Sequence, residues 1–361
     1  MAAESEAHAR GFAIRMFTAA VAAQELFTSY LGLKLGFYRE LAAGGPATPP
    51  ELARQCGADV RYVREWLEQQ AVAGILEVHD QAMPELDRRY LLPAGHAEAL
   101  LGTDSPYSIS PIAVLPMGAT GRVLPALLDA YRTGGGVPYT EYGEDSRDGH
   151  AGSNRALFTN NLADWIRRFL PDIHNRLLIS GRVADVGCGA GWASIALAKA
   201  YPDVHVDGFD LDQQSVLDAR RNAAEHGVAD RVSFEVRDCG DAELAGSYQL
   251  VCIFDALHDM SRPVEVLRTC RVLRANAGTV LVMDAKVPDQ FTAPGGDVER
   301  FLHAASVLHC LPVGRSEEPS AATGTAMRPS TVRTYAVKAG FSDIAVLPVD
   351  DLYHRLYRLL D

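Results

Sequence analysis

Apolar residues recur every three or four positions through the first part of the chain, which is the period of an amphipathic helix. They include Phe12, Met16, Leu26 and Phe37, and two glycines and a proline at residues 44–46 end the pattern. Glycine and proline terminate helices because neither is accommodated well in a helix interior. The pattern therefore predicts helical structure over residues 6–43.

The next stretch has the order of elements found in a winged helix. We expect a short helix to begin near Thr48, because threonine caps helices and the two prolines after it suit a first turn. A longer amphipathic helix is predicted over residues 58–76, with Val63, Trp66 and Leu67 on its apolar side. Two strand-like pieces at 75–80 and 88–93 complete the pattern, which predicts a winged-helix domain.

Residues 102–152 are rich in glycine, proline, serine and tyrosine, which is typical of a connecting segment. They hold one helical pattern at 121–135 and a glycine-rich loop at 134–149. The helical period returns over 154–178. From residue 181 strands and helices alternate, apart from a polar insertion at 285–325. This alternation predicts a mostly parallel sheet with helices on both faces.

The expected architecture is an α/β, Rossmann-like domain preceded by an all-helical and winged-helix domain. We place the helical and winged-helix domain at residues 1–102, a linker and lid segment at 103–154, and the α/β domain at 155–361. A chain of 361 residues has the length of two or three domains, because single cores seldom grow larger than about 250–300 residues.

Composition narrows the range of partners. The formal net charge is −12, and an acidic surface repels nucleic acid and anionic membranes. The six cysteines show no paired metal-binding spacing, as expected for buried reduced thiols. The N-terminus lacks the pattern of a signal peptide, and no uncharged run has the length of a membrane span. We therefore expect a cytoplasmic protein with neither a nucleic-acid nor a membrane partner.

The sharpest chemical signal is a glycine-rich turn between an apolar strand and a helix. The strand at 183–186 runs into Gly187, Gly189 and Gly191, and a helical pattern follows. Glycines let the chain turn sharply and let a ligand approach the backbone. The spacing differs from the G-x-G-x-x-G of dinucleotide sites. Asp185, just before the first glycine, would repel a pyrophosphate but suits a cationic ligand.

Further residues follow the ends of the neighbouring strands, where open α/β sheets bind ligands. Asp210 ends the second strand, where a carboxylate can hold both hydroxyls of a ribose, and Asp212 is the alternative if the register is shifted. Asp238 ends the third strand, where it can accept a hydrogen bond from an adenine amino group, beside the backbone N–H of Cys239. The fourth strand brings Phe254 to the same edge.

These motifs resemble those of the class I S-adenosylmethionine-dependent methyltransferases. DVGCGAG is similar to the first family motif, FDLD to the ribose motif, RDC to the adenine motif and DALHDM to the fourth-strand motif. ANAGTVLVMD is similar to the turn and fifth strand of the family, although this surface turn normally reads Pro-Gly-Gly and here reads Asn276-Ala277-Gly278. The resemblance covers 155–361, and the N-terminal part resembles the winged-helix domain of an actinobacterial branch. It implies S-adenosylmethionine as cofactor and a small organic acceptor bound between the two domains.

The resemblance also implies roles for single residues. The three glycines of the turn would line the methionine part of the cofactor, with Asp185 beneath it. Asp210 would hold the ribose, Leu211 would pack on the adenine, and Asp238 with the following N–H would bind the adenine edge. Tyr142 in the linker loop would reach the cofactor's carboxylate or close the pocket; the alternative is a packed loop tyrosine.

Methyl transfer needs an acceptor aligned with the S–CH₃ bond, and a phenol or an acidic carbon also needs a base. His258 is the first candidate because it follows the fourth strand, and Asp259 would orient it. His309, in the polar insertion, is the second candidate. The same three residues could instead form a two-histidine, one-carboxylate metal site.

Other functions stay open at this point. One is a winged-helix transcription regulator that senses a ligand through a methyltransferase-like domain, and another is a nicotinamide-dependent oxidoreductase. The acidic charge of residues 1–100 disfavours the first, and the glycine spacing disfavours the second. The methylated atom (O, N, C or S) is not fixed by the sequence. The N-terminal helices are apolar on more than one face, which predicts a homodimer.

Overall fold

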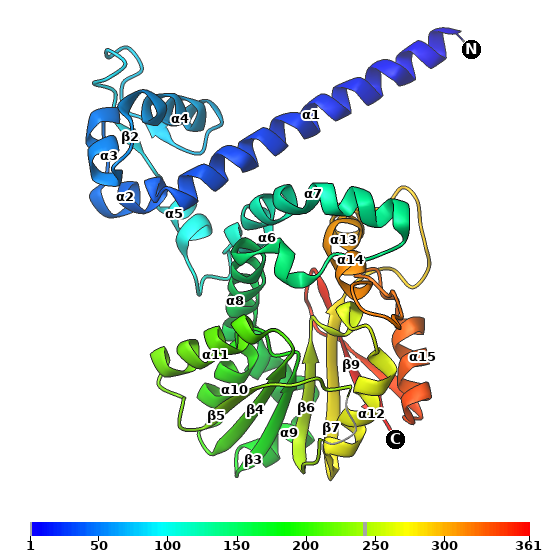
Figure 1. The fold of residues 1–361 in the computed structure, drawn as a ribbon. Helices are drawn as coiled ribbons and strands as arrows, with labels where there is room; N and C mark the ends of the chain where they lie inside the picture. Colours follow the sequence, from blue (N-terminus) through cyan, green and yellow to red (C-terminus); the bar gives the residue numbers. More distant parts are fainter. Residues whose placement is uncertain (1, 241–243) are drawn as a thin grey trace. The chain divides into compact units, whose positions relative to one another are not determined.

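The computed structural model describes residues 2–240 and 244–361 (Figure 1). The chain divides into two compact units, one formed by Met1–Ala119 with Asp148–Ser153 and the other by Thr120–Arg147 with Asn154–Asp361. The segment predicted as a linker is therefore divided between the two units.

The first unit carries the elements of the predicted winged helix. Thr48 and Glu51 form a capping box at the start of its first short helix, and Asp59 caps the next helix. The apolar sides of these helices pack around the buried side chains of Leu67 and Tyr90. The helices are α1 (Ala2–Lys34), α2 (Phe37–Gly44), α3 (Pro49–Cys56), α4 (Val60–Val72), α5 (Ala94–Leu101) and α6 (Ser110–Ala113), and the antiparallel wing is β1 (Glu77–Val78) with β2 (Tyr90–Leu91).

The second unit is built on a seven-stranded sheet with the strand order β5-β4-β3-β6-β7-β9-β8. The strands β3 to β7 run parallel, and β9 pairs antiparallel with both β7 and β8. The central strands are apolar because helices cover them on both faces. The bounds are β3 (Gly181–Val186), β4 (Val204–Asp210), β5 (Val232–Val236), β6 (Tyr248–Phe254), β7 (Arg274–Ala285), β8 (Asp343–Leu347) and β9 (His354–Leu360).

Helices connect the parallel strands of this sheet. Such crossovers are right-handed, so the reversal of strand order beside β3 puts α10 and α11 on one face and α12 on the other (Figure 1). The predicted Rossmann-like α/β fold is confirmed. The helices are α7 (Leu115–Thr133), η1 (Tyr139–Tyr142), α8 (Glu144–Phe169), α9 (Pro171–Leu177), α10 (Trp192–Ala200), α11 (Gln213–Glu225), η2 (Leu257–Asp259), α12 (Pro263–Leu273), α13 (Asp297–Ala305), the π-helix η3 (Ser306–Cys310), α14 (Leu311–Gly314) and α15 (Pro329–Ala339).

Two local predictions were wrong. The loop expected through residue 149 ends earlier, because α8 begins at Glu144, and the acidic pair Glu144 and Asp145 suits the positive end of a helix. The surface turn expected at 276–278 lies inside β7, which begins at Arg274. The sequence analysis also did not identify β9, the strand inserted between β7 and β8.

One helical segment, Ser110–Thr133, is long and apolar enough to cross a membrane. The sequence analysis had not singled it out, because Arg122 interrupts its uncharged run. Length and composition are weak evidence of a membrane span, since helices of soluble proteins can share both.

Candidate active site

The glycine-rich turn between β3 and α10 is tied to the end of β4. Gly187 N donates to Phe209 O at 2.8 Å, and Gly189 N donates to Asp210 Oδ2 at 2.8 Å. Gly191 has a φ of 80°, and a Cβ there would lie 2.6 Å from the Phe234 ring. A Cβ at Gly189 would meet no atom within 4 Å, so the turn has open space beside it that a ligand can use.

Two carboxylates stand beside this turn. Asp185 is 1% exposed, its Oδ2 accepts a hydrogen bond from Ser194 Oγ at 2.6 Å, and burial raises its pKa to about 6. Asp210 also accepts from Asp212 N at 2.9 Å, and burial raises the pKa of this carboxyl too. Burial disfavours the charged form of each acid, whereas a cation bound beside them would favour the charged form. The two carboxylates therefore suit a positively charged ligand.

The residues predicted to hold the adenine lie at the same end of the neighbouring strands. Leu211 is 58% exposed directly after β4, and Phe254 ends β6 with its ring buried. Asp238 accepts from Gly240 N at 2.7 Å and forms an ion pair with Arg262. Arg262 was missed by the sequence analysis, since nothing in the chain pattern links it to Asp238.

The thiol predicted beside Asp238 is buried, and burial raises the pKa of Cys239 to about 12. The thiol is therefore neutral, and the contact of the Cys239 backbone N–H with an adenine stays a prediction. The Phe254 ring packs against Phe158 of α8 with the ring centroids 5.4 Å apart. This packing fixes the end of β6 beside the glycine turn.

A cation missed by the sequence analysis lies at the start of α10. The Arg155 guanidinium carbon is 4.5 Å from the centroid of the Trp192 ring, and Trp192 directly follows the glycine turn. Stacking on an indole face holds the guanidinium in place. The turn therefore has a positive group near its α10 end in addition to the two carboxylates.

The second part of the site is centred on His258, in η2 directly after β6. Its Nδ1 donates to Asp284 Oδ1 at 2.8 Å, and its Nε2 lies 3.3 Å from Asp259 Oδ1. The side chains of His258 and Asp284 are 3% and 0% exposed. Burial by itself lowers the pKa of His258, but the charges of Asp259 and Asp284 outweigh it and hold that pKa well above its usual value.

Asp284 was missed by the sequence analysis although a signal for it exists. It follows the apolar run of β7, and β7 lies next to β6 in the sheet. The rule that polar residues after parallel strands meet at one edge selected Asp210 and Asp238, and it applies equally to Asp284. Asp284 Oδ1 also accepts from Ala285 N at 2.7 Å, which fixes the carboxylate beside His258.

The linker and the polar insertion pack together within the second unit. Tyr131 OH donates to Val307 O at 3.2 Å, and Tyr142 OH donates to Leu308 O at 2.9 Å. Tyr142 is 1% exposed. Its hydroxyl is thus engaged with the π-helix η3, the arrangement of the packed loop tyrosine that the sequence analysis gave as its alternative.

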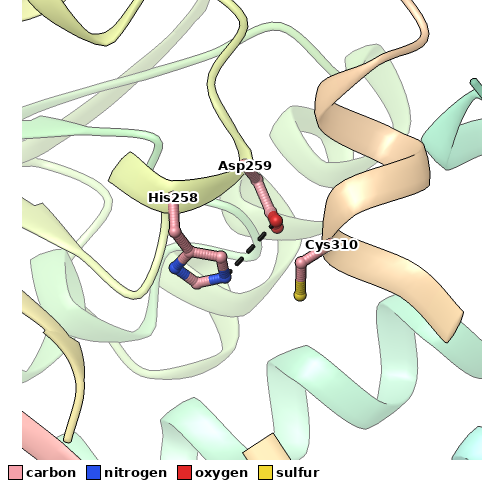
Figure 2. Close-up of side chains that lie close together, drawn as sticks. All are labelled: His258, Asp259 and Cys310. Carbon is pink, nitrogen blue, oxygen red and sulfur yellow. Dashed lines mark ion pairs between the residues drawn. The ribbon is translucent and has the colours of Figure 1, made fainter. Parts of the chain in front are cut away.

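The side chain that η3 brings to His258 is Cys310. His258, Asp259 and Cys310 each offer one ligand atom, and these atoms lie within 4.8 Å of one another (Figure 2). The sequence analysis had placed His309 in this group. Consecutive helical residues point in different directions, and the His309 ring packs edge-on against Tyr142 with the centroids 4.4 Å apart. The residues that come together are therefore one histidine, one carboxylate and one thiol, and not the two histidines and one carboxylate of the alternative metal site.

Comparison with known families agrees with this geometry. Residues 180–306 match a family model described as a methyltransferase domain, and residues 22–101 match a model described as an Rv2258c-like winged HTH domain. The chain therefore carries a methyltransferase domain with the class I S-adenosylmethionine-dependent fold, behind an N-terminal winged HTH domain. The predicted family and the predicted N-terminal winged helix are both confirmed for this methyltransferase.

The relatives that match this chain in sequence include several named O-methyltransferases. The O-methyltransferase SfmM3 of Streptomyces lavendulae is 28% identical over 74% of this chain and 78% of its own length. Ubiquinone biosynthesis O-methyltransferases match over shorter regions, and the match spans 46% of the length of the one from Bordetella avium.

Solved structures share the fold of this methyltransferase. The mitomycin 7-O-methyltransferase MmcR has a TM-score of 0.72 at 19% identity, and the match covers 99% of each chain. The O-methyltransferase NcsB1 from neocarzinostatin biosynthesis, in complex with S-adenosyl-L-homocysteine and 1,4-dihydroxy-2-naphthoic acid, has a TM-score of 0.58 at 20% identity, over 92% of this chain and 94% of its own.

Proposed function

We propose that this methyltransferase transfers the methyl group of S-adenosylmethionine to a hydroxyl oxygen of a small organic acceptor. The observation that carries the proposal is the buried His258, held between Asp259 and Asp284 at the sheet edge that also carries the glycine turn. A histidine fixed by a carboxylate is the usual base for an acceptor that must lose a proton. The O-methyltransferase names of SfmM3 and MmcR support oxygen as the methylated atom.

His258 acts as the general base in this proposal. Asp284 accepts a hydrogen bond from Nδ1–H, so that Nε2 is the nitrogen that takes up the proton of the acceptor hydroxyl. The hydroxyl oxygen then forms a bond to the methyl carbon as the S–CH₃ bond breaks, and the bonding electron pair stays on sulfur. Asp259 and Asp284 stabilise the positive charge that His258 gains. S-adenosylmethionine supplies an electrophilic methyl group on a positively charged sulfur.

Different residues around the glycine turn would bind different parts of the cofactor. In this proposal Asp185 and the glycines contact the methionine part, and Asp210 holds the ribose. Arg155 pairs with the carboxylate of the cofactor, a role supported by its stacking on Trp192 at the start of α10. Leu211, Asp238, Cys239 and Phe254 form the adenine end.

The regulator alternative is disfavoured by the charges of the winged helix. Helix α4 occupies the place of a DNA-recognition helix in this motif, and its basic residues are neutralised. Arg61 pairs with Glu65, and Arg64 pairs with Glu85. A helix that reads DNA needs free positive charge toward the phosphates. We therefore propose that the first unit serves substrate enclosure or subunit association.

Helix α1 supports association into a homodimer. Its first part carries large apolar side chains that are exposed, among them Phe12 (60%), Ile14 (62%) and Phe17 (72%). Contiguous exposed apolar surface on a helix marks an interaction site. A second copy of the same chain is the proposed occupant.

The test of the proposed function is a transfer assay with S-adenosylmethionine labelled in its methyl group. Phenols, hydroxyquinones and carboxylic acids are offered to the full chain, and the products are analysed for the methylated atom. Transfer to a hydroxyl oxygen that is lost in His258→Ala is the expected result. Transfer only to nitrogen or sulfur, or unchanged turnover in His258→Ala, would contradict the proposal.

A further inference from the structure

Three different metal-binding groups converge at the base. His258 Nε2 and Asp259 Oδ1 are 3.3 Å apart, and Cys310 Sγ completes a set whose atoms lie within 4.8 Å of one another (Figure 2). In a tetrahedral zinc site the bond lengths place neighbouring ligand atoms about 3.3–3.8 Å apart. The nitrogen–oxygen pair has that separation already, and the sulfur needs only a small displacement to reach it.

The surroundings of His258 match those of a metal ligand. A metal-bound histidine almost always donates its other ring N–H to a carboxylate or a carbonyl group. Here Nδ1 donates to the buried Asp284 at 2.8 Å, which directs the lone pair of Nε2 toward Asp259. The backbone carbonyl of His258 accepts from Gly324 N at 3.2 Å, so the turn that carries both ligands is fixed as well.

The third ligand is held by the π-helix η3. Two tyrosine hydroxyls, from Tyr131 and Tyr142, bind the consecutive carbonyl groups of Val307 and Leu308 in this turn. π-helical turns occur frequently at functional sites. Gly314 of α14 packs directly on η2, since a Cβ there would lie 3.3 Å from the carbonyl oxygen of Asp259. The insertion thus approaches η2 closely and holds Cys310 beside the histidine.

We propose that His258, Asp259 and Cys310 form a three-ligand site for a divalent cation of the zinc class. An imidazole, a carboxylate and a thiolate suit Zn²⁺, whereas Mg²⁺ and Ca²⁺ prefer oxygen alone. Binding releases the thiol proton and requires Nε2 to be unprotonated. Three protein ligands leave a fourth position open, as in catalytic zinc sites.

A hydroxyl of the acceptor could bind to the cation at the open position, and this would help methyl transfer. An acceptor hydroxyl bound there would lose its proton more readily, because a cation lowers the pKa of a bound oxygen acid. With Nε2 as a ligand of the cation, His258 would not act as the base, and the proton would pass to solvent. This inference rests on the proposed function, since it gives the same side chains a second way to activate the hydroxyl. It also narrows the acceptor to compounds whose oxygen atoms can reach a metal ion, such as phenols with a neighbouring carbonyl or carboxylate.

The experiment uses the full chain and two probe metals. The protein is dialysed against Zn²⁺ and its metal content is measured by mass spectrometry, and the Co²⁺ form is examined for a thiolate-to-metal band in the near ultraviolet. We expect one Zn²⁺ per chain and the thiolate band. Cys310→Ser should abolish the band and weaken Zn²⁺ binding at least tenfold. Cys56→Ser, a partly exposed thiol in α3, is the matched control and should keep both.

Other outcomes would overturn the site. Less than stoichiometric Zn²⁺ in the native chain, or an unchanged band in Cys310→Ser, removes it. Loss of the metal in His309→Ala together with its retention in Cys310→Ser would return the site to the ligands expected from the sequence. Titration of the same samples with S-adenosylmethionine keeps the two proposals apart. Cofactor binding and methyl transfer that persist after chelation overturn only the role of the cation in activating the hydroxyl, whereas Zn²⁺ binding without cofactor binding overturns only the proposed function.

Discussion

The imidazole Nδ1 of His258 lies 2.8 Å from Oδ1 of Asp284, and both side chains are buried. The two residues are 26 positions apart in the chain, on the ends of adjacent parallel strands or just beyond them. A carboxylate in this position fixes the tautomer of the histidine and stabilises its protonated form. The pair therefore sets the orientation of the proposed base before an acceptor binds.

Loss of the imidazole should affect turnover much more than cofactor binding. We expect His258→Ala to lower kcat by about 10²–10⁴-fold, the usual contribution of a general base. The affinity for S-adenosylmethionine should stay within about twofold, because no cofactor role is assigned to His258. Steady-state kinetics and calorimetry measure the two effects. His205→Ala, on the exposed side of β4, is the control, and wild-type turnover in His258→Ala would remove the residue as base.

The pH dependence of the reaction should reflect the carboxylates around the base. The charges of Asp259 and Asp284 hold the pKa of His258 above its ordinary value. Since the base works only when it is neutral, kcat/KM should rise with pH through this raised pKa. Asp284→Asn should move the rising limb to lower pH and also lower the plateau. A limb that stays in place in Asp284→Asn would show that another group controls it.

Asp185 should make the folded protein less stable as the pH rises. Burial raises its pKa from 3.8 to about 6, so the folded state binds a proton that the unfolded state has released between these values. Unfolding free energy should fall across this window by roughly 3 kcal/mol and stay low above it. In Asp185→Asn this contribution to the pH dependence should be absent, because the amide oxygen still accepts from Ser194 but does not ionise.

The measurement is urea unfolding of both proteins at pH 5 and pH 8. At pH 8 we expect Asp185→Asn to be the more stable protein, yet to bind S-adenosylmethionine more weakly because a negative charge beneath the sulfonium is gone. Ser180→Ala, an exposed serine before β3, serves as the control substitution. A variant with unaltered pH dependence would refute the assigned titration of Asp185.

The exposed apolar side of α1 should mediate association of two chains. We expect a dimer in sedimentation velocity at micromolar concentration, and Phe17→Glu should shift the protein toward the monomer because a buried unpaired charge opposes association. Arg54→Glu, a charge reversal at an exposed position of α3 outside this helix, should leave the dimer intact. A monomeric native chain would contradict this prediction.

The sequence predicted the parts of the site that depend on local pattern. The glycine turn and Asp210 follow from strand, turn and helix signals within thirty residues, so the chain order alone brings them together. Cys310 could not be predicted in this way, because its approach to His258 depends on the rotation of a π-helical turn. His309, next to it, has the more familiar ligand chemistry, but its ring packs on Tyr142.

The other differences between the predictions and the structure concern the start of α8 and the partners of two aspartates. The start of α8 at Glu144 was missed because the nearby glycines suggested a loop, whereas acidic residues in the first turn favour the helix. The pairing of Asp238 with Arg262 depends on the path of the chain between β6 and α12, which the spacing does not set. Asp284 could have been predicted by the rule that selected Asp210 and Asp238, because it also lies at the end of a parallel strand.

Titration calorimetry with S-adenosylmethionine tests the central claim most directly. We expect one saturable site per chain, and at least tenfold weaker binding in Asp210→Ala, because that carboxylate both ties down the turn at Gly189 and is placed to hold the ribose. Asp203→Ala, an exposed aspartate before β4, should bind as the native chain does. The absence of binding, or saturation by a nicotinamide dinucleotide in its place, would contradict the account.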